Sequence, residues 1–185
     1  MKKNYKRFFP ALNKEKIVNG YDFFISEDES VIYKKNNQSS ERLNKIFRDN
    51  TNMDFFLRIM DGIGLPAPLR PHIVNGFELE DDGSHKSPFL HGYRLDLLDS
   101  YELSDEEFKI IITETERLLS ILLLVSADNE LTGDWALHNL IFSLSHKRIM
   151  NVDLEGFVTY NPIPVWADIE IITEWIRSIQ RLRSI

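Results

Sequence analysis

The chain has 185 residues, of which 43% are apolar and 11% aromatic, so it is long enough to form one domain with a buried core. Its net charge of −7 argues against nucleic acid as the main partner, because an acidic surface repels phosphate backbones. The sequence contains no cysteine, which excludes disulfides, thiolate nucleophiles and cysteine-bound metals.

The N-terminal part predicts β-strands. Segments 21–26 and 30–35 are rich in aromatic and β-branched residues and are separated by a short polar stretch, which is typical of a hairpin. Upstream, Asn19-Gly20 follows the apolar pair in 16–18, and Asn-Gly is a preferred two-residue hairpin turn. We therefore expect three antiparallel strands at the start of the domain.

Two short helices and three further strands are expected next. Segments 40–47 and 52–61 carry apolar residues at helical spacing, and glycines and a proline directly after the second segment end it. Strands are expected around 72–74, 77–80 and 89–93, where short apolar runs lie between turn residues.

The second half of the chain is mainly helical. Ser104 and Glu107 form a capping box at the start of a long run of apolar residues at helical spacing. Segments 140–142 and 149–152 predict a short hairpin, and 168–182 predicts a closing helix. This order of elements predicts an α+β fold and not an alternating parallel sheet.

No segment predicts a membrane span or a signal peptide. The most apolar stretch, 110–125, contains Glu114, Glu116 and Arg117, and charged side chains are costly in a bilayer. The basic segment 1–10 is not followed by the apolar region of a signal peptide. We expect a soluble, cytoplasmic protein without a transmembrane segment.

Three polar residues of the second half suggest phosphoryl-transfer chemistry. Asp134 follows the long helix, Asn139 lies five residues later, and Asp153 follows the second strand of the short hairpin. Phosphoryl transfer needs a carboxylate that accepts the proton of the attacking hydroxyl and hard oxygen ligands for Mg²⁺. We therefore expect Asp134 to be the base, and Asn139 and Asp153 to bind Mg²⁺ at one edge of the hairpin.

These residues also carry a family resemblance. Gly133-Asp134 with Asn139, followed by Asp153-Leu-Glu155, resembles the H-G-D-x-x-x-x-N … D-[FW]-E run of aminoglycoside and choline kinases. Asp134-x-x-x-x-Asn139 also matches the spacing of the catalytic loop of protein kinases. The sequence is therefore similar to the protein-kinase-like superfamily, which implies ATP and Mg²⁺ as cofactors.

The resemblance implies a protein-kinase-like two-lobed fold over a single domain, 1–185. An antiparallel N-lobe sheet would occupy about 15–93, with a hinge near 89–95. A reduced, truncated helical C-lobe would occupy about 96–185, because the chain has room for one helix after Asp168. In related kinases an aspartate at that position braces the catalytic loop.

The resemblance also assigns residues to the nucleotide. Segment 31–34 is similar to the third-strand V-A-I-K, which makes Lys34 the residue that contacts the phosphates. Lys35 is the alternative, because adjacent strand residues face opposite ways. Asp54 would be the acidic partner of that lysine, and Glu41 competes for this role.

The adenine would be held by backbone groups of the hinge, at Leu90, His91 and Gly92. The expected function is transfer of a phosphoryl group to the hydroxyl of an unidentified acceptor, with a small molecule or glycan slightly favoured over a protein. Thr132 stands where most of the family has histidine, and no glycine-rich phosphate loop is present. A pseudokinase or nucleotide-binding interaction module, and a kinase-like enzyme that transfers AMP, are therefore the alternatives.

Overall fold

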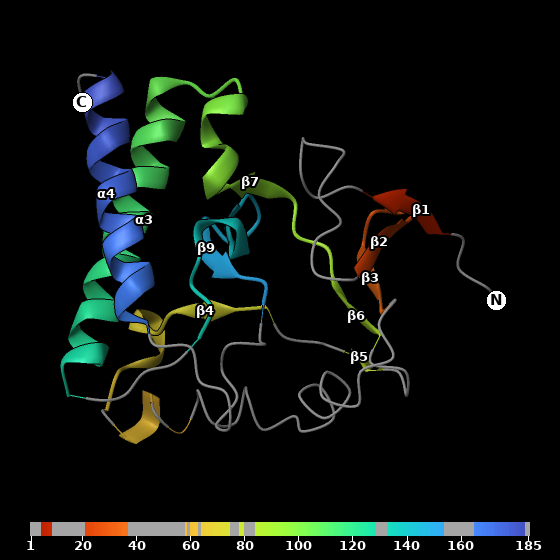
Figure 1. Ribbon diagram of the computed structural model, residues 1–185, viewed down its shortest axis with the longest axis horizontal. Coiled ribbons are helices and arrows are strands. Elements are labelled where there is room, and N and C mark those ends of the chain that lie inside the picture. Colours follow the sequence, from red (N-terminus) through yellow and green to blue (C-terminus); the bar gives the residue numbers. More distant parts are fainter. Residues whose placement is uncertain are drawn as a thin grey trace. The chain divides into compact units, whose positions relative to one another are not determined.

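In a computed structural model, the chain forms two compact units, which are described separately (Figure 1). The N-terminal unit comprises Met1–Asn50 with Val74–Leu90, and the C-terminal unit comprises Thr51–Ile73 with His91–Ile185. The structure describes residues 5–8, 21–36, 58, 60–62, 64–74, 78–79, 84–128, 133–153 and 165–183.

The N-terminal unit contains a five-stranded sheet in the order β1-β2-β3-β6-β5, and every neighbouring pair is antiparallel. Its strands are β1 (Tyr5–Phe8), β2 (Tyr21–Ser26), β3 (Val31–Asn36), β5 (Glu78–Leu79) and β6 (His85–Pro88). Aromatic and β-branched residues form β2 and β3 because such side chains pack well on a pleated surface. The expected β2–β3 hairpin is confirmed.

The β2–β3 turn is held by side-chain hydrogen bonds. The Ser26 hydroxyl accepts the backbone N–H of Val31 at 3.0 Å, and Asp28 accepts the N–H of Ser30 at 3.2 Å. Glu29 adopts a left-handed backbone conformation with φ of 52°. The polar residues between the two strands therefore satisfy the backbone groups that the tight turn leaves without strand partners.

Two expectations for the N-terminal strands need correction. On the side away from β3, the strand that pairs with β2 is β1, Tyr5–Phe8. The segment 16–20, which was expected to lead into this pairing, lies outside the described residues. The strand expected around 89–93 is confirmed only in its last two residues, because β7 begins at Gly92 and ends at Arg94. The strand β6, which ends at Pro88, was not expected. Pro88 pairs with the first residue of β3, and Phe89 donates its N–H to Ser30, just outside that strand.

The two short helices expected before residue 62 are only partly within the described residues. Segment 40–47 lies outside them, and within 52–61 the structure describes 58, 60 and 61, all of which are helical. A short 3-10 helix, η1 (Ala67–Leu69), follows.

The C-terminal unit contains a four-stranded mixed sheet in the order β4-β9-β8-β7, in which β4 is parallel to β9 and the other pairs are antiparallel. The protein is therefore a mixed α and β fold with one antiparallel and one mixed sheet. The strands are β4 (His72–Ile73), β7 (Gly92–Arg94), β8 (Leu140–Ser143) and β9 (Arg148–Asn151). Besides η1, the described helices of this unit include η2 (Leu95–Ser100), α3 (Asp105–Asp128), η3 (Leu137–Asn139) and α4 (Trp166–Arg183).

Helix α3 begins at the expected capping box. The backbone N–H of Glu107 donates to the Ser104 hydroxyl at 3.3 Å, and the Glu107 carboxylate accepts the Ser104 N–H at 3.0 Å. The hydrogen bond from the Ser104 hydroxyl also lowers the pKa of Glu107. The two residues therefore satisfy backbone donors that the first turn of a helix leaves unpaired.

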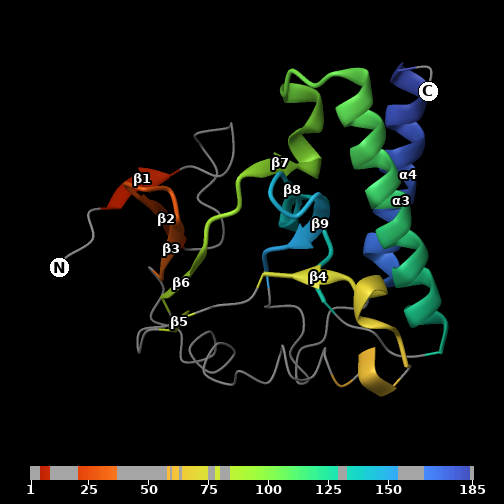
Figure 2. The same cartoon turned by 180° about the vertical axis from the view of Figure 1, so that it is seen from behind.

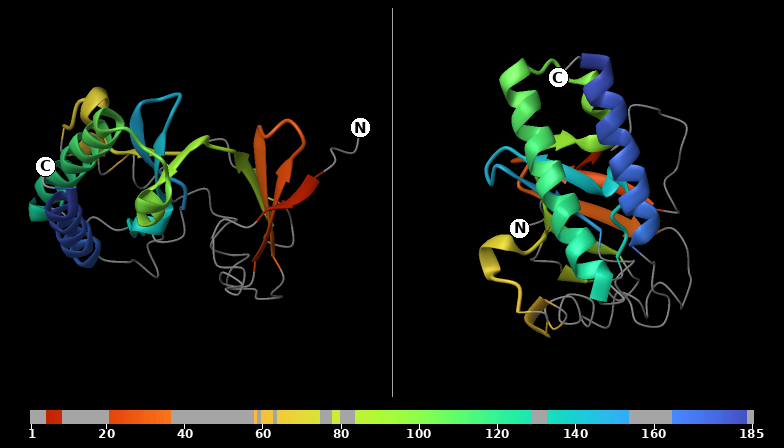
Figure 3. Two further views of the ribbon diagram at one scale, coloured as in Figure 1. Left: turned by 90° about the horizontal axis from the view of Figure 1, so that it is seen from above. Right: turned by 90° about the vertical axis from the view of Figure 1, so that its left-hand side faces the viewer.

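Helices α3 and α4 lie side by side and run in opposite directions, with the mixed sheet on one side of the pair (Figures 1, 2 and 3). The Gln180 amide donates to the Glu116 carboxylate across the pair at 2.9 Å. No helix of the described residues is long and apolar enough to cross a membrane. The core between the helices and the sheet is apolar and includes Leu95, Phe108, Leu122, Trp135, Leu140 and Ile172.

We predict that Ser104→Ala lowers the free energy of unfolding by about 1 kcal/mol, because it removes the helix cap. Urea unfolding followed by tryptophan fluorescence measures this in the full chain, since all three tryptophans belong to the C-terminal unit. Ser178→Ala, on the exposed face of α4, is the control. It is expected to raise stability by a few tenths of a kcal/mol, because alanine has a higher helix propensity than serine. Equal effects of the two substitutions would contradict a capping role for Ser104.

Candidate functional site

The candidate site lies in the C-terminal unit, where the chain passes from α3 into the β8–β9 hairpin. Asp134 lies in the loop before β8, Asn139 is the last residue of η3, and Asp153 follows β9. Leu140 and Asn151 pair at this end of the hairpin. The hairpin therefore brings the two loops to one edge of the mixed sheet, as the sequence predicts.

Asn151 joins the two loops through its side-chain amide. Its Nδ2 donates to the backbone carbonyl of Asp134 at 2.7 Å, and its Oδ1 accepts the backbone N–H of Asp153 at 2.8 Å. Asn151 is fully buried, whereas Asp134 and Asp153 are half-buried, so the two bonds are partly shielded from water. No role was predicted for Asn151 from the sequence. The signal available was an asparagine inside a strand-forming segment, where asparagine is disfavoured.

Asn139 is held in the same network. Its backbone carbonyl accepts the N–H of Val152 at 3.0 Å, and its own N–H donates to Ala136 at 2.8 Å. Its side-chain Nδ2 makes a long hydrogen bond of 3.5 Å to the carbonyl of Asp134. Asn139 is buried, and its amide oxygen accepts no hydrogen bond from the described residues, so this is the side-chain atom that could bind a ligand.

The Asp134 carboxylate is half-buried and only partly engaged. Its Oδ1 accepts the backbone N–H of Ala136 at 3.2 Å, which forms a short turn of the type that aspartate favours. Within the described residues, Oδ2 accepts no hydrogen bond. One carboxylate oxygen thus fixes the side chain while the other remains able to accept a proton or a hydroxyl group.

Asp168 supports this loop from α4. Its Oδ2 accepts the backbone N–H of Trp135 at 2.8 Å, and both residues are buried. Burial raises the pKa of Asp168, the hydrogen bond from Trp135 lowers it, and the charge of Asp134 raises it. Asp168 therefore has the place and the contact that the resemblance implies for an aspartate that braces the loop.

Lys34 belongs to the N-terminal unit, on the third strand of its sheet. Its side chain is half-buried, and its Nζ lies 5.7 Å from the centre of the Phe23 ring, within range of a cation–π interaction. Lys35, which points to the opposite face of the strand, is exposed. Asp54 and Glu41, the two expected acidic partners of the lysine, lie outside the described residues.

The segment expected to hold adenine lies where the chain passes from one unit to the other, between Leu90 and His91. The carbonyl of His91 already accepts the N–H of Leu144 at 3.0 Å. Gly92 pairs with Ser143, and a Cβ at Gly92 would lie 2.1 Å from a carbonyl oxygen of β8. The glycine is therefore required by close strand packing, and adenine binding by Leu90, His91 and Gly92 stays a prediction.

The donor set of the candidate site is small. Within the described residues, no group of three or more histidines, cysteines and acids is placed to hold a metal ion. The site offers the amide oxygen of Asn139 and the carboxylate of Asp153. Such a pair suits Mg²⁺, which keeps several waters and binds one or two protein oxygens together with substrate phosphates.

Comparison with known proteins gave no match, either among protein-family models or among curated proteins. Function is therefore inferred from the chain's own residues. The hydrogen-bond network around Asn151 is the feature of the C-terminal unit that bears most directly on the function.

We predict that Asn151→Ala strongly destabilises the C-terminal unit. The substitution removes the hydrogen bonds that Asn151 makes to the Asp134 carbonyl and the Asp153 N–H, and leaves the carbonyl only the long bond from Asn139. The loss of a hydrogen-bond partner by a buried group costs about 1–3 kcal/mol. Urea unfolding followed by tryptophan fluorescence measures the loss. A change below about 0.5 kcal/mol, the usual effect of a surface substitution, would contradict the bridging role of Asn151.

We predict opposite effects for two substitutions of Asp168. Asp168→Ala leaves the Trp135 N–H unpaired and lowers stability by about 1–3 kcal/mol, whereas Asp168→Asn keeps an acceptor oxygen. Because the pKa of Asp168 is raised in the folded state, the charged carboxylate opposes folding once the pH rises through that pKa.

Asp168→Asn should therefore match the parent at acidic pH and become the more stable of the two as the pH rises. Unfolding free energies measured between acidic and neutral pH test this. A difference between parent and Asp168→Asn that is constant with pH would contradict the raised pKa.

Proposed function

We propose that the protein is a small protein-kinase-like phosphotransferase that uses Mg²⁺ and ATP to phosphorylate a hydroxyl group. In this proposal the N-terminal unit is the N-lobe and the C-terminal unit is a reduced C-lobe. The observation that carries it is the network in which Asn151 links the backbone of Asp134 to that of Asp153, with Asn139 in the same network. The order and spacing of these residues match the kinase pattern.

Asp134 is proposed to be the general base. Its Oδ1 is fixed by Ala136, and its Oδ2 is available to accept the proton of the acceptor hydroxyl. The hydroxyl oxygen forms a bond to the γ-phosphorus of ATP, the bond from that phosphorus to the bridging oxygen breaks, and ADP leaves. The proton of the hydroxyl passes to Asp134, so atoms and charges balance.

Asn139 and Asp153 are proposed to hold Mg²⁺. Bound Mg²⁺ neutralises part of the phosphate charge as it develops during transfer. Asn151 ties together the backbone of the two loops that carry the amide oxygen and the carboxylate. Holding these groups in advance reduces the reorganisation that the reaction requires.

Lys34 is proposed to contact the α- and β-phosphates. It lies on the third strand of the N-terminal sheet, which is the strand that carries this lysine in protein kinases. Its half-buried side chain distinguishes it from the exposed Lys35. Its ammonium group also lies within cation–π range of the Phe23 ring, which helps to hold the side chain on this face of the sheet.

The acceptor is proposed to carry an alcohol hydroxyl, with a small molecule or glycan favoured over a protein. The support is the resemblance of 153–155 to the corresponding run of small-molecule kinases. The half-buried position of Asp134 is compatible with a hydroxyl that approaches from solvent.

We predict that the protein incubated with Mg²⁺, ATP and a panel of sugars, aminoglycosides and amino alcohols produces ADP and an acceptor heavier by one phosphate. Mass spectrometry measures both products. Asp153→Asn should reduce ADP formation at least about 100-fold, because it removes the anionic metal ligand. Lys34→Met should reduce it at least about ten-fold, and its matched control Lys35→Met should leave it within about two-fold.

ATP binding without any product would favour the nucleotide-binding interaction module, and an acceptor heavier by AMP would favour the AMP-transferring enzyme. ADP formation by Asp153→Asn at the parental rate would contradict the metal-binding role of Asp153. A Lys35→Met variant less active than Lys34→Met would contradict the choice of lysine.

A further inference from the structure

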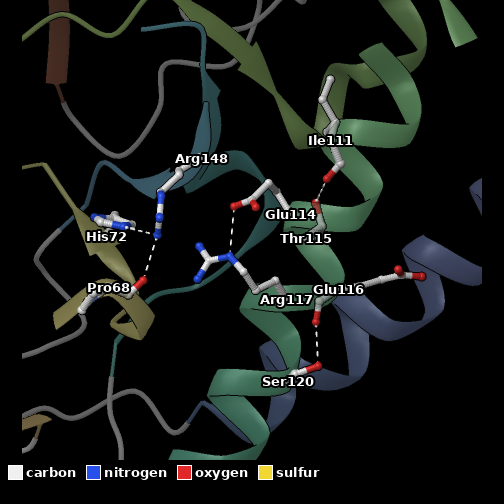
Figure 4. Close-up of polar contacts among 9 residues, drawn as sticks. All are labelled: Pro68, His72, Ile111, Glu114, Thr115, Glu116, Arg117, Ser120 and Arg148. Carbon is white, nitrogen blue, oxygen red and sulfur yellow. Dashed lines mark hydrogen bonds and ion pairs between the residues drawn. The ribbon is translucent and has the colours of Figure 1, made fainter. Parts of the chain in front are cut away.

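A second cluster of polar side chains lies in the C-terminal unit, at the turn end of the β8–β9 hairpin (Figure 4). Arg148 is the first residue of β9, His72 is the first residue of β4, and Glu114 and Arg117 come from α3. Arg148 and Asn151 are at opposite ends of a four-residue strand. The cluster is therefore displaced from the candidate phosphoryl-transfer site by about 10 Å along the hairpin.

Arg148 uses only part of its guanidinium group. Its Nη1 donates to the carbonyl of Pro68 at 3.0 Å and lies 3.1 Å from Nε2 of His72. Because arginine cannot act as an acceptor, this contact requires His72 Nε2 to be unprotonated. Nε and Nη2 of Arg148 make no hydrogen bond within the described residues, so two donors of this group are available.

Arg117 is also incompletely paired. Its Nε donates to the Glu114 carboxylate at 3.0 Å, whereas its Nη1 is buried and has no hydrogen-bond partner in the described part of the chain. The Arg117 side chain as a whole is 25% exposed, so it is not sealed within the core. Figure 4 shows the guanidinium groups of Arg117 and Arg148 directed toward the same region between α3 and β9.

Among the residues that the structure describes, the charges of this cluster do not balance. Arg117 and Arg148 carry two positive charges, and Glu114 supplies one negative charge. Burial lowers the pKa of His72, and the nearby positive groups lower it further, in the order Arg148, Arg117 and His146, while Glu114 acts in the opposite direction. A partly buried cation without a counter-charge is destabilising, and a bound anion would remove that cost.

We propose that Arg117 and Arg148, with His72 beside them, form a binding site for a phosphate group that is separate from the site of phosphoryl transfer. Guanidinium groups bind phosphate through several parallel N–H donors, and here the donors come from two elements, α3 and β9. The several oxygens of a phosphate can accept N–H donors from both guanidinium groups at once. A carboxylate offers only two acceptor oxygens.

The test is a titration of the full chain with inorganic phosphate at constant ionic strength, followed by NMR of the arginine side-chain N–H groups. Saturable shifts of Arg117 and Arg148 are expected, with a dissociation constant on the order of 1 mM. Arg148→Met should weaken binding at least about ten-fold. Arg177→Met is the matched control: it removes a positive charge that pairs with Glu174 on the exposed face of α4, and should change binding less than about two-fold.

Two further variants keep the test decisive. Glu114→Gln removes only the competing carboxylate and should tighten phosphate binding at least about three-fold, even if substitution of Arg148 prevents folding. Lys34→Met should leave binding unchanged, which separates this site from the proposed nucleotide site. The proposal is overturned if the NMR shifts do not saturate, or if phosphate binds Arg148→Met as tightly as the parent. It is also overturned if phosphate binds Glu114→Gln no more tightly than the parent, or if acetate binds the parent as tightly as phosphate does.

Discussion

The candidate site of the C-terminal unit depends on a buried side chain that holds two loops together. Asn151 donates to the carbonyl of Asp134 and accepts the N–H of Asp153, so one amide fixes the backbone of both residues. These residues lie far apart in sequence, and their placement follows from the β8–β9 hairpin, whose open end carries Asn151. A buried amide with both ends satisfied is geometrically strict, because either loop can shift only by leaving a buried polar group unpaired.

The loop before β8 is supported from several directions. Asp168 of α4 accepts the N–H of Trp135, the Trp135 side chain is buried in the core, and Asn139 accepts the N–H of Val152. The packing of α3 against α4 and the sheet therefore fixes the position of the Asp134 carboxylate. This rigidity is what the proposed chemistry needs, since a base and metal ligands act best when they are held in place before the substrate binds.

Much of this arrangement could be predicted from local sequence, and the remainder could not. The capping box at Ser104, the β8–β9 hairpin and the closing helix follow from short-range patterns, and the structure confirms them. The strand expected at 89–93 lies at 92–94 instead, because strand limits are set by the partner strands: β6 stops where β3 begins, and β7 starts where β8 offers pairing. Asn151 was missed for a similar reason, since its partners are provided by tertiary contacts. The Arg117–Arg148–His72 cluster likewise joins three elements that no local pattern connects.

The central claim is that Asn139 and Asp153 bind one divalent ion beside Asp134. NMR of the full chain with Mn²⁺ and a non-hydrolysable ATP analogue tests it most directly, because the paramagnetic ion broadens the signals of nearby amides. Selective broadening at 134–139 and 152–153, lost in Asp153→Asn, is expected. Broadening centred on other residues, or unchanged by Asp153→Asn, would contradict the claim.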